Sequence, residues 1–124
     1  IASALSYPLS VHYRVPHGIG GGMFLASVIK FNVDGGYAGY GDLAQQIALG
    51  DSGNQVGLSH QFLEEFQGLM AYLEVPETLA EWGIASTDLE ELVEIMTPMQ
   101  SAFDQNPVPF SADTDARNIL RQHI

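Results

Sequence analysis

The segment SYPLSVHYRVPHGIGGGMFLASVIKFN, residues 6–32, decides the fold. A Pro-His-Gly kink joins two apolar stretches in it, and residues 19–33 are apolar on almost every side of a helical projection. A helix that is apolar all round lies inside a protein core. The segment therefore predicts a central helix from Ile19 to Val33, packed among the other elements of the chain.

Helical spacing recurs after this segment. Apolar residues follow one another at steps of three and four in the ranges 37–50, 56–74 and 89–103, which is the signature of amphipathic helices. The loop DSGN at 51–54 separates the first two, and Gly50 is the expected C-cap of the first. In the second helix the predicted buried stripe consists of Leu58, Phe62, Phe66, Leu69 and Leu73.

The C-terminal half also contains residues that typically begin or end helices. A short helical turn is expected between Pro76 and Gly83, and Thr87 with Glu90 matches a capping box ahead of the third helix. Pro98 removes a backbone donor and predicts a kink near residues 96–97. Ser111 is expected to open the last helix, after the turn DQNPVPF at 104–110.

The sequence contains no pattern typical of β-strands. No stretch alternates apolar and polar residues for more than a few positions, and no Asn-Gly hairpin turn is present. The sequence predicts an all-α fold in which residues 1–124 form a single helical domain, a compact bundle of about five to seven helices.

Composition excludes several classes of partner. Fifteen acidic residues against four basic ones give a net charge of -11, which repels nucleic acid and anionic membranes. No apolar run approaches the roughly 18 residues of a membrane helix. Cysteine is absent, so a reducing, cytoplasmic location is the default. The chain opens inside an apolar segment at Ile1 without methionine, so we expect a fragment of a longer protein.

The histidines and glycines of the opening segment raise two questions of chemistry. His12 and His17 lie five residues apart across Pro16, so they cannot form an i, i+4 metal pair on one helix face. The run Gly20 to Gly22 lacks the lysine and the preceding strand of a phosphate-binding loop. Glycine within a helix is costly, so the run predicts a close approach of another backbone or a ligand.

The segment nevertheless resembles the metal-site signature of the iron-containing alcohol dehydrogenases. The order and spacing of ten residues match that pattern: Tyr7, Pro8, Leu9, Pro16, His17, Gly18, Leu25, Val28, Phe31 and Asn32. The stretch QNPVPFSADTDARNIL, residues 105–120, is similar to the closing link and last helix of the same family. The resemblance implies the all-helical C-terminal domain found in the iron-containing alcohol dehydrogenase and dehydroquinate synthase-like folds.

The resemblance also implies roles for individual residues. His17 takes the position of a ligand to the catalytic divalent metal, iron or zinc, whereas Ser3 stands where a second ligand histidine is expected. Tyr7 and Gly21 fall at substrate-pocket positions. The family transfers hydride to or from NAD(P), but the other metal ligands and the nucleotide-binding domain would precede Ile1. The 124 residues alone are therefore expected to bind no cofactor and to be catalytically inactive, with His17 facing a cleft or interface.

Three hypotheses remain open at this point. The chain is part of an alcohol dehydrogenase-like oxidoreductase, or a stand-alone, non-catalytic helical module that binds a protein partner, or a different helical protein with a chance resemblance. An apolar surface around Leu5, Leu9, Ile19 and Met23 would be left open without the nucleotide-binding domain. Self-association covers such surfaces, so we expect a homo-oligomer, a dimer in the simplest case.

Overall fold

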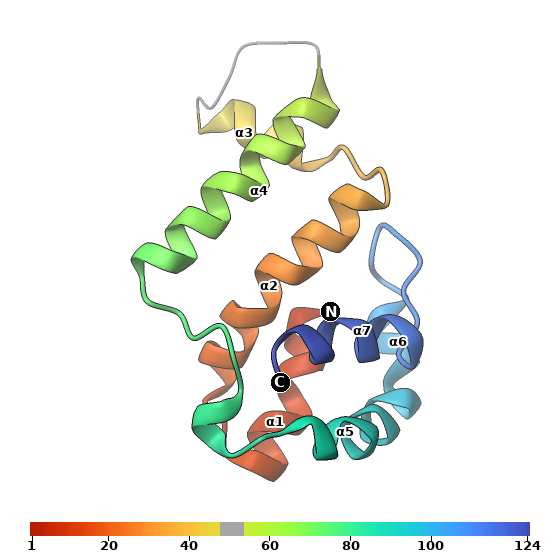
Figure 1. Ribbon diagram of the computed structural model, residues 1–124. Coiled ribbons are helices and arrows are strands. Elements are labelled where there is room, and N and C mark those ends of the chain that lie inside the picture. The colour runs from red at the N-terminus through yellow and green to blue at the C-terminus, as the bar shows by residue number, and fades with distance from the viewer. Residues whose placement is uncertain (48–53) are drawn as a thin grey trace.

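The computed structural model describes residues 1–47 and 54–124, which fold into helices and turns without a β-strand (Figure 1). Within these residues no helix combines the length and apolarity of a membrane span. The all-α class is confirmed, whereas Gly50 and residues 51–53 of the expected loop lie outside the described residues. The elements are α1 Ala2–Tyr13, α2 His17–Asp34, α3 Tyr40–Gln46, α4 Gln55–Tyr72, η1 Ala80–Trp82, η2 Ser86–Asp88, α5 Leu89–Met96, η3 Thr97–Met99, α6 Gln100–Phe103 and α7 Thr114–Gln122.

Helix α2 begins two residues earlier than the sequence predicts. Pro16 is its N-cap, with φ of -57°, and the Pro16 carbonyl accepts hydrogen bonds from the N–H groups of Ile19 and Gly20 at 2.9 and 3.0 Å. The proline ring fixes a φ that suits a helix start and lacks only a donor that would be unpaired there. His17 is therefore the first residue of α2.

The close approach predicted from the glycine run occurs at one of its three positions. A Cβ on Gly20 would lie 3.0 Å from Cβ of Ser6 in α1, so glycine allows α1 and α2 to touch backbone to side chain. A Cβ on Gly21 would meet nothing within 4 Å, and one on Gly22 would meet only Val75 at 3.9 Å. The steric reason for glycine therefore applies to Gly20 alone.

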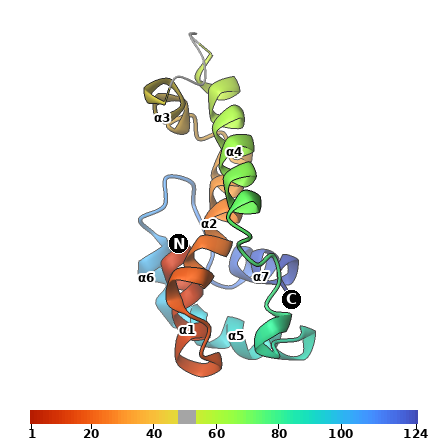
Figure 2. The same ribbon diagram turned by 90° about the vertical axis from the view of Figure 1, so that its left-hand side faces the viewer.

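Two hydrophobic clusters share α2. The smaller one joins Ile29 and Val33 to Leu63 of α4, with Tyr40, Phe62 and Phe66 packed against it. The larger one is formed by α1, by α2 as far as Val28 and by the elements that follow α4, so the α3–α4 pair projects from the rest of the molecule (Figure 2). Its buried members include Leu5, Leu9, Phe24, Leu79, Leu92, Met96, Phe103 and Leu120.

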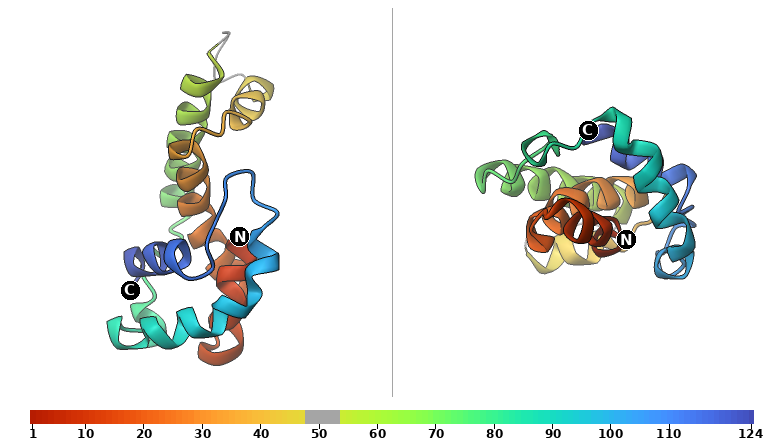
Figure 3. Two further views of the ribbon diagram at one scale, coloured as in Figure 1. Left: turned by 90° about the vertical axis from the view of Figure 1, so that its right-hand side faces the viewer. Right: turned by 90° about the horizontal axis from the view of Figure 1, so that it is seen from below.

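The central position of α2 is confirmed in part. It packs between α1 and α4, as the two views of Figure 3 show, and Phe24 is fully buried. Ile19 and Leu25, in contrast, remain 37% and 39% exposed. One side of α2 therefore lies at the surface, although its sequence is apolar on all sides.

The apolar surface expected around Leu5, Leu9, Ile19 and Met23 does not exist in that form. The first two side chains are fully buried and Met23 is only 4% exposed, because they belong to the large cluster of this chain itself. The exposed apolar residues of α1 are instead Tyr7 and Val11, one turn apart. The helical period of α1 therefore assigns its apolar residues to two opposite faces.

The stripe predicted along α4 is wrong in its second half. Leu58 is buried and Phe66 packs on the small cluster, but Leu69 and Leu73 are 48% and 56% exposed. Buried Leu63, which the predicted stripe omits, faces α2 instead. The stripe is broken because α4 packs on α2 with a face that includes Leu63, and the C-terminal turns of α4 are left uncovered.

Helix α5 ends where Pro98 predicts a kink. The 3-10 turn η3 follows Met96 and is succeeded by the short α6. The predicted capping box of Thr87 and Glu90 is wrong, because Asp88 provides the interaction instead. Its carboxylate accepts a hydrogen bond of 2.8 Å from the N–H of Ala85, at the start of η2.

A buried amide pair fastens the turn at 104–110 to α2. Asn32, 1% exposed, donates to Oδ1 of Asn106 at 3.0 Å and to the hydroxyl of Tyr40 at 3.0 Å. Asn106 donates back to Oδ1 of Asn32 and, at 2.7 Å, to the carbonyl of Val108. The last helix begins at Thr114 with Asp113 as its N-cap, three residues later than predicted, although the Ser111 hydroxyl accepts from the N–H of Thr114 at 3.0 Å.

Candidate functional site

His17 lies between two serine hydroxyls of α1. Its Nδ1 is 3.0 Å from Oγ of Ser6, and its Nε2 is 3.3 Å from Oγ of Ser3. The close packing of Ser6 on Gly20 brings the start of α2 to this part of α1. The two residues that the resemblance assigns to neighbouring ligand positions, Ser3 and His17, are therefore in contact although they are 14 residues apart.

The hydrogen bonds of Ser6 select one tautomer of the neutral His17 ring. The Ser6 hydroxyl donates to the carbonyl of Ser3 at 3.0 Å, so its oxygen is left to accept from Nδ1–H of His17. In the neutral ring Nε2 then carries the lone pair and accepts from the hydroxyl of Ser3. His17 is exposed to solvent on this side.

Tyr7 and Gly21 each lie one helical turn beyond this contact. Tyr7 follows Ser3 on α1 and is 57% exposed, and Gly21 follows His17 on α2, with open space where a Cβ would be. Their role in a substrate pocket stays a prediction. His12 is exposed near the end of α1.

The donor set around His17 does not fit a divalent metal. Iron and zinc sites in proteins use three or four ligands drawn from histidine, cysteine, aspartate and glutamate. This contact offers one imidazole and two neutral hydroxyls, which already occupy both ring nitrogens. Over residues 1–47 and 54–124, no three such metal-ligating side chains come together.

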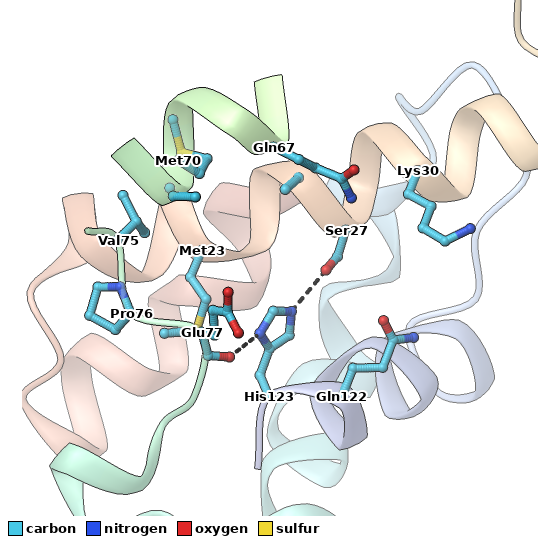
Figure 4. Close-up of a pocket in the computed structure, with 13 residues that line it drawn as sticks. Met23, Ser27, Lys30, Gln67, Met70, Val75, Pro76, Glu77, Gln122 and His123 are labelled. Atoms are coloured by element: carbon cyan, nitrogen blue, oxygen red, sulfur yellow. Dashed lines mark hydrogen bonds between the residues drawn. The ribbon is translucent and has the colours of Figure 1, made fainter. Parts of the chain in front are cut away.

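A second polar arrangement, which the sequence analysis did not find, lies in a cavity between α2, α4 and the chain end (Figure 4). His123, just after α7, contacts Ser27 of α2 through Nε2 at 2.8 Å and the carbonyl of Glu77 through Nδ1 at 2.8 Å. The cavity has a volume of about 370 Å³. Ser27 and His123 are 96 residues apart, so no local motif signals their contact.

Burial lowers the pKa of His123 below its ordinary value, since desolvation of the imidazolium outweighs the opposing influence of Glu77 through its backbone hydrogen bond and its charge. The ring also meets the edge of Phe24, with centroids 5.2 Å apart and planes at 86°. His123 is thus a neutral, fixed imidazole at neutral pH.

Comparisons with known proteins bear on the family and the fold of the chain. The model of the Fe-containing alcohol dehydrogenase family, C-terminal part, matches residues 1–124. An NADPH-dependent butanol dehydrogenase of Clostridium saccharobutylicum is 26% identical over 97 residues, which are 78% of this chain and 25% of that protein. A crystal structure of 1,3-propanediol oxidoreductase superposes with a TM-score of 0.77 and 20% identity, over 98% of this chain and 31% of the other.

These comparisons place the chain within larger relatives. It spans about a quarter of the butanol dehydrogenase and about a third of the propanediol oxidoreductase. The likeness to the second shows a shared fold, and the family match covers every residue of this chain. The chain belongs to the Fe-containing alcohol dehydrogenase family and corresponds to its C-terminal, helical part.

Proposed function

We propose that residues 1–124 serve as the C-terminal part of a metal-dependent, NAD(P)-linked alcohol dehydrogenase-like oxidoreductase and have no alcohol dehydrogenase activity by themselves. The observation that carries this proposal is the contact between Ser3 and His17. Side chains from two helices converge there, as the ligands of a metal must. One of the two, however, is a hydroxyl in place of the imidazole that the family resemblance implies.

The named relative supports the class of reaction. The butanol dehydrogenase uses NADPH by its title, and hydride transfer to a nicotinamide requires a nucleotide-binding domain that this all-helical chain does not supply. The remaining metal ligands and the nicotinamide site would belong to other residues of a longer protein. His17 and the open surface beside Tyr7 and Gly21 would then face that domain.

A hybrid protein tests the proposal. The part of 1,3-propanediol oxidoreductase that superposes on this chain is replaced by residues 1–124, and folding, nicotinamide binding and alcohol oxidation are measured. The expected hybrid is folded and binds the nicotinamide, as shown by quenching of protein fluorescence, but does not oxidise alcohols. A hybrid that cannot fold, or one that turns over like the parent enzyme, would contradict the proposal.

Restoring the second imidazole is expected to create partial zinc binding. In the Ser3→His variant two histidines face each other across α1 and α2, so zinc should bind about tenfold more tightly than to the unchanged chain, a gain of about 1.4 kcal/mol. Calorimetric titration measures the affinity. The double variant Ser3→His, His17→Ala is the control and should lose the gain; if it keeps it, the metal is held elsewhere.

The alternative function, a self-associating helical module, is favoured by the exposed side chains of α1. Tyr7 and Val11 are 57% and 58% exposed and lie on one helix face. If this face is an interface between two copies, sedimentation shows a dimer that Val11→Glu dissociates. The control Tyr72→Glu, at an 83% exposed position of α4, should leave the dimer intact. A monomer at high concentration would contradict self-association.

A further inference from the structure

The contact of Ser27 with His123 has a defined direction. The carbonyl of Glu77 can only accept, so Nδ1 of His123 carries the proton in their 2.8 Å hydrogen bond. Nε2 is then unprotonated in the neutral ring and accepts the hydroxyl of Ser27 at 2.8 Å. Activated nucleophiles in enzymes have this arrangement. The hydroxyl donates to one imidazole nitrogen, and a third group orients the ring through the other nitrogen.

Three interactions hold the His123 ring in this position. Besides the hydrogen bond to Glu77, the edge-on contact with Phe24 restricts its plane. The backbone of His123 is also held, because the N–H of Leu79 donates to the His123 carbonyl at 2.7 Å. The base therefore does not depend on a bound ligand for its orientation, and catalytic geometry of this kind is preorganised.

The cavity in front of Ser27 has walls of two kinds (Figure 4). Met23, Met70 and Val75 form an apolar side, whereas the side-chain amide of Gln67 brings N–H donors to the other part. Lys30 also lines the cavity, but its ammonium group is paired with the exposed carboxylate of Asp34 at 2.6 Å and points away from Ser27. An unbranched aliphatic acyl group matches the apolar side, and a developing oxyanion matches the N–H donors.

We propose that Ser27 is a nucleophile, His123 its general base, and the cavity an acyl-binding site for small esters of unbranched aliphatic acids. Ser27 Oγ attacks the ester carbonyl carbon while its proton passes to Nε2 of His123. The bond from carbon to the leaving oxygen then breaks, and the proton moves from Nε2 to that oxygen, which leaves as the alcohol. Water repeats both steps on the acyl-serine and releases the carboxylic acid.

The experiment uses the 124-residue chain and p-nitrophenyl butyrate. We expect a burst of p-nitrophenolate that approaches one equivalent per chain, and a butyryl group on the peptide that contains Ser27 by mass spectrometry. Ser27→Ala, which suits a helix interior, and His123→Gln should each abolish the burst. Ser10→Ala and His60→Gln are matched controls, a helical serine that donates to the carbonyl of Ser6 and an exposed histidine of α4, and both should leave it unchanged.

The pH dependence provides a second readout. The neutral imidazole is the active form, so the acylation rate is level at and above neutral pH and falls as the pH drops through the pKa of His123. Because burial lowers that pKa, the midpoint should lie below the ordinary value for histidine. Butyrylation of other residues, a burst that survives Ser27→Ala, or a folded chain without any burst would each overturn the proposal.

Discussion

Replacing Phe24 with alanine is expected to reduce the free energy of unfolding by about 3–5 kcal/mol. The ring is fully buried in the large cluster and supports His123 through its edge-on contact. Its removal costs both the transfer free energy of the ring and a cavity that the packed helices cannot fill. Urea denaturation followed by circular dichroism measures the change in the midpoint.

The neighbouring position supplies the control. Leu25 lies on the same helix but is 39% exposed, so Leu25→Ala should cost less than about 1 kcal/mol. Equal costs for the two substitutions would show that the side of α2 that carries Leu25 is buried in solution, and would contradict the packing of this helix.

Replacing Asn32 with alanine is expected to reduce the free energy of unfolding by about 3 kcal/mol, since buried groups left without partners cost about 1–3 kcal/mol each. Asn106 would lose its reciprocal partner, and the Tyr40 hydroxyl would lose a donor. The turn at 104–110 would also lose its attachment to α2. Calorimetry gives the stability change, and limited proteolysis reports cleavage within that turn.

An exposed asparagine is the control for this substitution. Asn118 lies on the surface of α7, so Asn118→Ala should change stability by no more than about 0.5 kcal/mol. If Asn32→Ala left both the stability and the protease resistance of the turn unchanged, the amide pair would not be the fastening that the structure indicates.

The sequence predicts the helical elements well because their signals are local. Pro98 ends α5 through its own missing donor, and the Ser111 hydroxyl accepts from the N–H of Thr114, the first residue of the last helix. Which residues pack on each helix depends on segments that are distant in the sequence, and the burial of individual side chains is therefore predicted less well. Leu5 and Met23 look like open surface in the sequence but are covered by later helices, whereas Leu69 looks like core and is left exposed.

In the candidate site, too, only some of the contacts could be predicted from the sequence. The family resemblance assigns His17 and Ser3 to neighbouring ligand positions, and the structure places the two side chains in contact. The hydroxyl of Ser6, which fixes the tautomer of His17, is not part of any spacing rule. The contact between Ser27 and His123 depends on how α7 returns across α2, and a single sequence carries no signal for that return.

The sharing of α2 by two clusters has a consequence for how the molecule opens. Among the described residues, the smaller cluster has three buried members, Ile29, Val33 and Leu63, and the larger cluster has many more. Regions with few buried apolar contacts open at a smaller free-energy cost than the whole fold. We therefore expect α3 and α4 to unfold at a smaller free-energy cost than the α1–α2 contact that holds His17, so that the backbone amide protons of α3 and α4 exchange faster than those of α2.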